Sequence, residues 1–134
     1  MVTEKNGDSA RKDEAARTLL VVEDQPIIRR SILRALRDGW RISEAGSLAD
    51  ARKTLKELTP DIVLLDLRLP DGDGEELIDE IRSRDWSVMP AIIVISGRPG
   101  DVGTEVLRKG AAGYLSKPFT ASELRSTLEE ALRP

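Results

Sequence analysis

Four apolar runs of this chain are each followed by a side chain that could take part in chemistry. These side chains are Glu23 with Asp24, then Asp66, Ser96 and Lys117. If they converge, the clustered carboxylates repel one another and favour a divalent cation. Oxygen ligands suit Mg²⁺, which keeps some of its waters and commonly shares its shell with a phosphate. A carboxylate can also act as a nucleophile and form an aspartyl phosphate, whose oxygens a lysine and a hydroxyl could bind.

The segment around Asp66 is the most informative stretch. Residues 62–65 are four consecutive apolar residues, a pattern typical of a central strand that is buried on both faces of a parallel sheet. Asp66 ends this run, and a proline and two glycines within residues 67–74 then predict a loop. Ligands of open α/β sheets bind outside the carboxyl ends of the strands, so Asp66 is expected at a binding edge.

The remaining elements must bring these strand ends together. Short apolar runs predict strands at residues 18–23, 40–44, 61–66, 91–96 and 112–116. Amphipathic segments between and after them predict helices at residues 26–38, 47–58, 74–84, 101–109 and 120–132. Strands that alternate with helices predict an α/β fold with a doubly wound five-stranded parallel sheet, because each crossover must return right-handed over the sheet. The spacing alone does not fix the strand order.

Local signals support the helix boundaries. Ser47 is a candidate N-cap, Gly110 a candidate C-terminal stop, and Thr120 with Glu123 a candidate capping box. Helical spacing also predicts the buried faces. The first helix should bury Ile27, Ile28, Ile32, Leu33 and Leu36, and the second should bury Leu48, Ala51, Leu55 and Leu58.

Length and composition narrow the class of protein. The chain has 134 residues, enough for one domain with its own core, and it contains neither cysteine nor histidine. Thiol catalysis, zinc–thiolate sites and a phosphohistidine on this chain are therefore excluded. The net charge of -3 argues against direct nucleic-acid binding, and the absence of a long apolar stretch predicts a cytoplasmic protein. Residues 1–17 are expected to form a disordered lead-in or linker, and residues 18–134 the domain.

Four motifs follow one another along the chain. They are Val-Val-Glu-Asp-Gln-Pro at 21–26, the segment 61–74 with Leu-Asp-Leu-Arg-Leu-Pro-Asp-Gly-Asp-Gly, Ile-Val-Ile-Ser-Gly at 93–97 and Gly-Ala-Ala-Gly-Tyr-Leu-Ser-Lys-Pro-Phe at 110–119. In type and order they resemble the motifs of the response-regulator receiver domains of bacterial two-component signalling, from about Thr18 to Arg133. Each motif alone is weak, whereas four at the right spacing are specific. The resemblance implies the flavodoxin-like receiver fold with strand order 2-1-3-4-5.

The resemblance also implies a role for each site residue. Asp66 would accept the phosphoryl group, and Asp24, Asp66 and the backbone carbonyl of Arg68 would ligate Mg²⁺. Glu23 would act mainly through a metal-bound water. Ser96 would bond the phosphoryl group and Lys117 would form its ion pair, across a cis peptide bond to Pro118.

A receiver domain is a switch rather than a conventional enzyme. The resemblance implies that a sensor histidine kinase or a histidine phosphotransfer protein donates the phosphoryl group. Ser96 and Tyr114 would then move and remodel the face formed by the fourth helix, fifth strand and fifth helix, which would act on a downstream protein or output domain or form a phosphorylation-dependent dimer. Arg68 and Arg98 flank the route of water to the phosphoryl group and are expected to slow its hydrolysis.

Other functions fit the residues less well. A phosphatase or dehalogenase with an Asp-x-Asp motif would need an acid where Arg68 stands. A calcium loop at 71–82 would need a glycine at Glu76 and a glutamate at Arg82. The chain also lacks the phosphate-binding loop of nucleotide hydrolases. A degenerate receiver that serves only as a binding surface would not need Asp24, Asp66, Ser96 and Lys117 together.

Overall fold

The computed structural model describes residues 17–36, 38–97, 100 and 102–133. The predicted lead-in lies outside the described residues except for Arg17, which is already part of the first strand. The predicted helix start at Asp101 and the residue Arg98 also lie outside the described residues.

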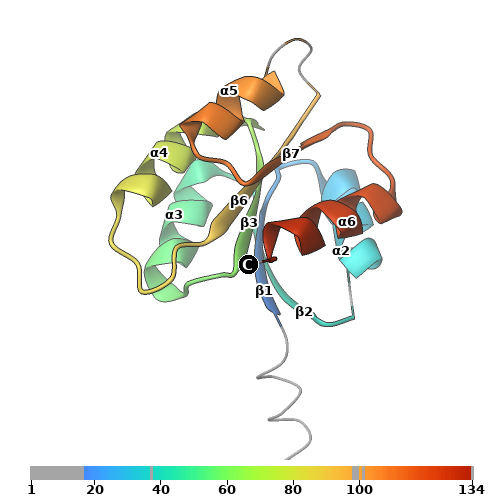
Figure 1. Ribbon diagram of the computed structural model, residues 1–134, viewed down its shortest axis with the longest axis horizontal. Helices are drawn as coiled ribbons and strands as arrows, with labels where there is room; N and C mark the ends of the chain where they lie inside the picture. The colour runs from blue at the N-terminus through green and yellow to red at the C-terminus, as the bar shows by residue number, and fades with distance from the viewer. Residues whose placement is uncertain (1–16, 37, 98–99, 101, 134) are drawn as a thin grey trace, which may run out of the picture.

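A five-stranded parallel sheet forms the centre of the molecule (Figure 1). Its strands are β1 (Arg17–Val22), β2 (Trp40–Ala45), β3 (Ile62–Asp66), β6 (Ala91–Ser96) and β7 (Gly113–Ser116). Their order across the sheet is β2-β1-β3-β6-β7, so the third, fourth and fifth strands of this sheet along the chain lie on one side of β1. The predicted doubly wound sheet with strand order 2-1-3-4-5 is thereby confirmed.

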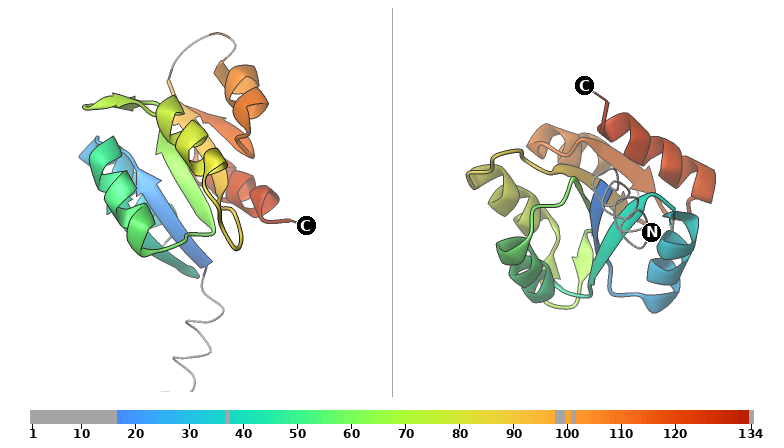
Figure 2. Two further views of the ribbon diagram at one scale, coloured as in Figure 1. Left: turned by 90° about the vertical axis from the view of Figure 1, so that its left-hand side faces the viewer. Right: turned by 90° about the horizontal axis from the view of Figure 1, so that it is seen from below.

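Helices cover both faces of the sheet (Figures 1 and 2). They are α2 (Pro26–Leu36), α3 (Leu48–Glu57), α4 (Glu75–Ser83), α5 (Val102–Lys109) and α6 (Ala121–Ala131). The first and last of these lie on one face, and α3, α4 and α5 lie on the other.

Each central strand contributes to two core layers, because successive side chains of a strand point to opposite faces. Along β1, Leu20 and Val22 pack in the layer under α3, α4 and α5, whereas Leu19 and Val21 pack in the layer under α2 and α6. All five residues of β3 are buried. Burial of one such aliphatic side chain contributes about 1.5–3 kcal/mol, so the sheet is a rigid base for the side chains at its edge.

The predicted helix boundaries are confirmed at their caps. The Ser47 hydroxyl accepts a hydrogen bond from the Asp50 N–H at 3.1 Å, and Thr120 and Glu123 form the reciprocal capping box. Gly110 follows the end of α5 with φ +114°, a left-handed conformation that suits glycine.

Two residues predicted to be buried are exposed, and Ile28 and Leu33 are only half-buried. The buried face of α2 runs through Ile28, Ile32 and Leu36, four residues apart, and Ile27 lies about 100° around the helix from Ile28. Ile27 is therefore 77% exposed. Leu58 follows the last residue of α3 in an extended conformation, so helical spacing no longer places its side chain, and it is 36% exposed.

The segment after Asp66 contains more regular structure than a loop. Residues Arg68–Leu69 (β4) and Gly72–Asp73 (β5) pair antiparallel in a small hairpin. The Gly74 N–H closes this hairpin by donating to the Leu67 carbonyl at 2.8 Å. The sequence prediction of a loop here missed the hairpin because two-residue strands are too short to show periodicity.

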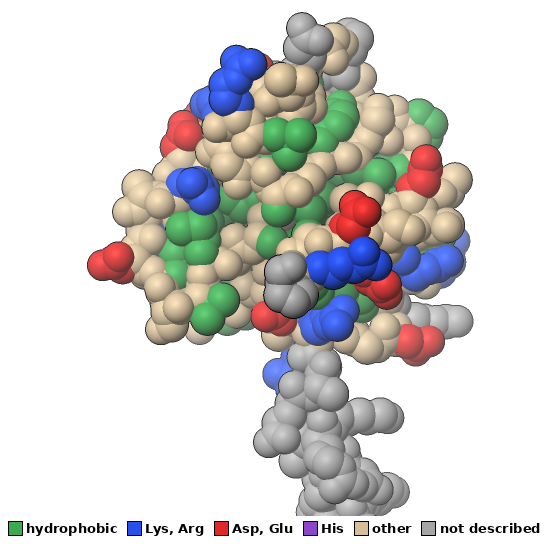
Figure 3. Space-filling view, viewed as in Figure 1, with side chains coloured by type: hydrophobic (Ala, Val, Ile, Leu, Met, Phe, Trp, Pro, Cys, Tyr) green, Lys and Arg blue, Asp and Glu red, His purple; other side chains and the backbone are tan. Residues whose placement is uncertain are grey.

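The surface of the described residues mixes charges of both signs. On the face drawn in Figure 3, acidic and basic side chains are interspersed among apolar ones rather than gathered by sign. Among the described helices, none combines the length and the apolar character that crossing a membrane would require.

Replacement of Gly74 by alanine should destabilise the fold. Gly74 has ordinary helical dihedral angles, φ -59° and ψ -20°, so the cost is steric: a Cβ would collide with the Asp66 carbonyl oxygen and lie 2.9 Å from Leu67 Cα. We expect a loss of about 1–3 kcal/mol in the free energy of unfolding, measured by urea denaturation. Gly46→Ala is the control, because its Cβ would meet only the movable guanidinium of Arg29 at 3.3 Å. An equal loss in both variants would contradict this explanation.

Candidate functional site

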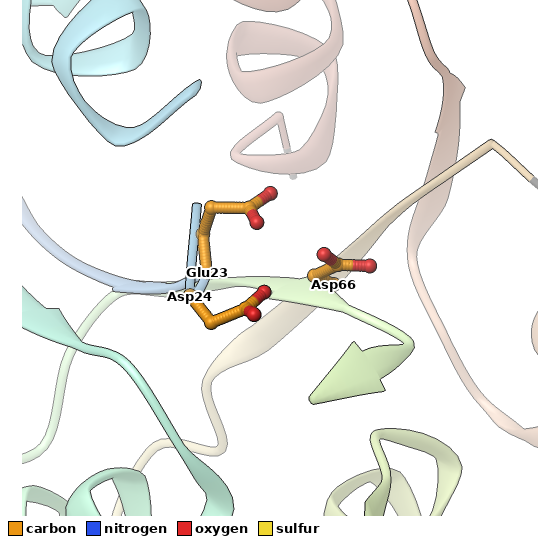
Figure 4. A group of neighbouring side chains, drawn as sticks. All are labelled: Glu23, Asp24 and Asp66. Carbon is orange, nitrogen blue, oxygen red and sulfur yellow. The ribbon is translucent and has the colours of Figure 1, made fainter. Parts of the chain in front are cut away.

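Strand order brings the predicted acidic residues together. In the parallel pairing of β1 with β3, Val22 lies opposite Leu65, so the residues that follow Val22 lie beside Asp66 at the same edge of the sheet. Oxygens of Glu23, Asp24 and Asp66 all lie within 4.8 Å of one another (Figure 4). The structure therefore forms the predicted three-carboxylate cluster.

The Asp66 carboxylate is almost fully buried, at 4% exposure, and both its oxygens have partners. Oδ1 accepts a hydrogen bond from the Arg68 N–H at 3.0 Å, and Oδ2 accepts one from Lys117 Nζ at 3.0 Å. Two donors from different segments thus fix the rotamer of the candidate acceptor.

Lys117 links two carboxylates. Its Nζ lies 3.0 Å from Asp66 Oδ2 and 3.0 Å from Glu23 Oε1. Burial opposes the charged form, yet the contacts with Glu23 and Asp66 outweigh it and raise the pKa of Lys117 above its ordinary value. The Lys117 N–H donates to the Ser96 carbonyl at 2.9 Å, and the Lys117–Pro118 peptide is cis as predicted.

Glu23 is the most buried acid of the site, with no exposed surface. Its Oε2 accepts a hydrogen bond from the Gln25 N–H at 3.1 Å. Its Oε1 has the ion pair with Lys117 but no partner with hydrogen-bond geometry. Burial, aided by the negative charge of Asp66, raises the pKa of Glu23 to about 7 against the opposing effect of Lys117. A fully buried carboxylate beside two other acids is suited to a hard divalent cation.

A cleft of about 290 Å³ opens over these side chains. Its lining residues are Asp24, Gln25, Asp66, Arg68, Ser96, Gly97 and Lys117. Asp24 is exposed, whereas Ser96 is 2% exposed at the end of β6. The structure thus places the predicted Asp24, Asp66, Arg68, Ser96 and Lys117 around one opening, with Glu23 beneath it.

Tyr114 lies away from this opening. It belongs to β7, is half-buried and packs against the core layer under α3, α4 and α5. A Cβ at Gly103 of α5 would lie only 3.0 Å from its ring, so the ring fits closely against a helix position without a side chain.

Two acids of the hairpin segment have partners that the sequence analysis missed. Asp71 accepts hydrogen bonds from the backbone N–H groups of Leu48 and Ala49, and Asp73 accepts one from the Glu75 N–H at 2.9 Å. The backbone contacts lower the pKa of the Asp71 carboxyl. The Asp73 contact could have been found from sequence, because an aspartate two residues before a helix start commonly binds the helix N-terminus. The Asp71 contact joins segments more than 20 residues apart and left no local signal.

Comparison with known proteins identifies the relatives of the chain. Residues 19–129 match the response regulator receiver domain family. The KDP operon transcriptional regulatory protein KdpE of Escherichia coli is 41% identical over 116 residues, which cover 86% of this chain and 51% of that protein. The probable transcriptional regulatory protein TcrX of Mycobacterium tuberculosis is 32% identical over 124 residues, which cover 92% and 53%. The chain spans about half the length of these curated relatives.

Solved structures include a receiver domain of the same family and a protein that is similar in fold. The receiver domain of a sensor histidine kinase from Pseudomonas aeruginosa, with a magnesium ion coordinated in its active-site cleft, is 30% identical with a TM-score of 0.76 and covers 87% of this chain and 98% of that domain. The chemotaxis response regulator CheY4 of Vibrio cholerae is similar in fold, with 24% identity, a TM-score of 0.80, and coverage of 87% and 99%.

The raised pKa of Glu23 predicts a pH-dependent stability of the metal-free protein. In the unfolded chain this carboxyl has its ordinary pKa of 4.5, whereas in the folded chain its pKa is about 7. Between these values the folded state holds a proton that the unfolded state has lost, so the contribution of Glu23 to the free energy of unfolding falls as pH rises from about 4.5 to about 7.

The test compares wild type with Glu23→Gln, which cannot titrate. The difference between their free energies of unfolding should change by roughly 2–3 kcal/mol over that pH window, with wild type the one that loses stability. The measurement is urea unfolding in the presence of a chelator at a series of pH values. A difference that stays constant with pH would show that folding does not raise the pKa of Glu23.

Proposed function

The chain belongs to the response regulator receiver domain family, whose members are phosphorylation-controlled signalling switches, and we propose that Asp66 is its phosphoryl acceptor. The observation that carries the proposal is the nearly buried Asp66 carboxylate, which is held between the Arg68 N–H and the Lys117 ammonium at the floor of an open acidic cleft. A fixed, cleft-facing carboxylate oxygen is a competent nucleophile for an aspartyl phosphate.

We propose Asp24, Asp66 and the backbone carbonyl of Arg68 as the Mg²⁺ ligands, with Glu23 acting through a metal-bound water. The full burial of Glu23 and the three carboxylates within 4.8 Å support this assignment. The related kinase receiver domain holds magnesium in the corresponding kind of cleft. When bound, Mg²⁺ neutralises the acids and the oxygens of the incoming phosphoryl group.

The residues of the chain then have separate roles in the transfer. An Asp66 oxygen would form the new P–O bond while the P–N bond of a donor phosphohistidine breaks. Lys117 would offset the charge of the phosphoryl oxygens, and the Ser96 hydroxyl would donate a hydrogen bond to one of them. No external substrate besides the phosphoryl donor is turned over, so the chain is not a conventional enzyme.

The proposed partners are those of a two-component system. The donor would be a sensor histidine kinase or a histidine phosphotransfer protein, because the chain belongs to the response regulator receiver domain family. Ser96 and Tyr114 would couple phosphorylation to the face of α5, β7 and α6, which would act on a downstream protein, on an output domain, or in a phosphorylation-dependent dimer. The relatives are transcriptional regulators, and the matched segments cover 51% and 53% of their length. We assign this switch to residues 18–134 together with Arg17, which belongs to β1, and a linker role to the residues before Arg17.

Replacement of Asp66 by asparagine should abolish phosphorylation and leave the fold intact. The amide is a poor nucleophile but has almost the size of the carboxylate, and its oxygen can still accept the Arg68 N–H. Incubation with a small-molecule phosphodonor and Mg²⁺, followed by intact-mass measurement, should add one phosphoryl group to wild type and none to Asp66→Asn. Asp85→Asn, at an exposed position on the loop after α4, is the matched control and should be phosphorylated like wild type. Labelling of Asp66→Asn at the wild-type level would place the acceptor elsewhere.

Mg²⁺ should stabilise the folded protein through the same acids. At roughly ten times its dissociation constant, free Mg²⁺ should raise the free energy of unfolding by about 1.4 kcal/mol. Asp24→Ala should lose most of this gain, because Asp24 is the acid that the cleft exposes to solvent. Thermal melts with and without Mg²⁺ measure the effect, and Asp85→Asn should keep it. A full Mg²⁺ shift in Asp24→Ala would mean that the ion binds at other residues.

A further inference from the structure

Asp71 joins the acceptor segment to a helix that the chemistry of the site does not otherwise involve. It lies in the turn between β4 and β5, and its carboxylate accepts the Leu48 N–H at 2.8 Å and the Ala49 N–H at 2.9 Å. Both donors belong to the first turn of α3. The contact therefore fixes the tip of the hairpin onto the N-terminus of α3.

Side chains bind the first three backbone N–H groups of α3 and so fix the start of this helix. The first N–H groups of a helix have no partner within the helix. Asp71 binds two of those of α3 and the Ser47 hydroxyl binds the third, that of Asp50. The carboxylate also lies at the positive end of the helix dipole, where a negative charge is favoured. Asp71 and Ser47 thus cap the same helix end, but only Asp71 belongs to the hairpin.

A second contact holds the hairpin at the same place. Gly72 lies against the side chain of Leu48, which is 1% exposed, so closely that a Cβ on Gly72 would come within 2.8 Å of Leu48 Cδ1. The turn is thus attached to α3 by a charged contact at Asp71 and an apolar one at Gly72.

The other strand of the hairpin reaches the acceptor. Arg68 pairs with Asp73 and Leu69 with Gly72, so the position of the turn determines the position of Arg68. The Arg68 N–H donates to Asp66 Oδ1 at 3.0 Å. The continuous path therefore runs from α3 through Asp71 and the hairpin to the backbone of Arg68 and the carboxylate of Asp66.

We propose that Asp71 is a positioning residue for the acceptor and metal site: by fixing the hairpin to α3 it holds the Arg68 backbone where it orients Asp66 and can ligate Mg²⁺. The inference rests on the proposed Mg²⁺ site. It predicts that Asp71 affects metal binding although its carboxylate is bonded to α3 and is not one of the proposed ligands. A purely local cap would affect the stability of α3 and leave metal binding unchanged.

The test measures Mg²⁺ dissociation constants by titration calorimetry for wild type, Asp71→Ala, Asp71→Asn and Ser47→Ala. Loss of a direct outer-shell partner of a metal ligand weakens binding by one or two orders of magnitude. Asp71 acts only through the hairpin backbone, so Asp71→Ala should lie at the lower end of that range and bind Mg²⁺ about tenfold more weakly. Asp71→Asn should be intermediate, because its one amide oxygen can still accept one N–H. Ser47→Ala removes a cap from the same helix end without touching the hairpin, and its Mg²⁺ affinity should equal that of wild type.

Amide hydrogen exchange of the metal-free proteins provides a second readout. Exchange over residues 67–74 should be faster in Asp71→Ala and Asp71→Asn than in wild type, and unchanged in Ser47→Ala. Equal Mg²⁺ affinity in wild type and both Asp71 variants, or faster exchange over 67–74 in Ser47→Ala as well, would overturn the inference. If Asp71→Ala does not fold, the comparison of Asp71→Asn with wild type alone tests the inference. If wild type binds no Mg²⁺, or Asp24→Ala binds it equally well, the proposed metal site is wrong instead.

Discussion

The charge balance at the carboxyl edge of the sheet is the constraint on which the site depends. Three carboxylates whose oxygens lie within 4.8 Å would repel one another strongly, and one ammonium, that of Lys117, contacts two of them. Above the pKa of Glu23 these four groups sum to a charge of -3 + 1 = -2. In the metal-free protein the raised pKa of Glu23, about 7, lets this carboxyl keep a proton near neutral pH, which reduces the excess negative charge. A divalent cation would remove the excess entirely, which explains why an acid can be kept fully buried beside two others.

The fold makes this cluster possible because the strand order reverses beside β1. From β1 the chain passes first to β2 on one side, and β3 then returns to the other side of β1. In open α/β sheets such a reversal leaves a crevice at the carboxyl ends of the two central strands. Glu23 and Asp24 follow one of these strands and Asp66 ends the other, so the backbone topology places the like charges together. The buried layers on both sides of β3 then prevent the strands from moving apart to relieve the repulsion.

The sequence predicted those parts of the structure that depend on local patterns. Buried strands, helix caps and the arrival of acids at strand ends all leave a signal within a few residues, and Asp66, Ser47 and Thr120 were predicted on that basis. Contacts between segments that are distant in the sequence leave no such local signal. The Asp71 cap of α3 and the shared ion pair of Lys117 with Glu23 depend on strand order and register, which spacing does not determine. The burial of Ile27 was predicted wrongly for a related reason. An isoleucine at a helix start fits an apolar stripe in the sequence, but the side of α2 that packs against the sheet is the one with Ile32 and Leu36.

The same charge balance indicates why phosphorylation would change the structure around the site. With Asp66 as the proposed acceptor, its conversion to an aspartyl phosphate would add about one negative charge to the cluster and bring new oxygens that need donors. Lys117 already contacts Glu23 and Asp66, so it cannot meet the added charge without redistributing these contacts. Gln25, Arg68 and Ser96 are further side-chain donors that line the cleft. Of these, Ser96 ends a strand of the central sheet, and its carbonyl accepts the Lys117 N–H. Ser96 is the last residue of β6, the strand that precedes α5. Lys117 directly follows β7, the strand that contains Tyr114. New contacts from Ser96 and Lys117 to the phosphoryl oxygens would therefore move the two segments that connect the cleft to the α5, β7 and α6 face.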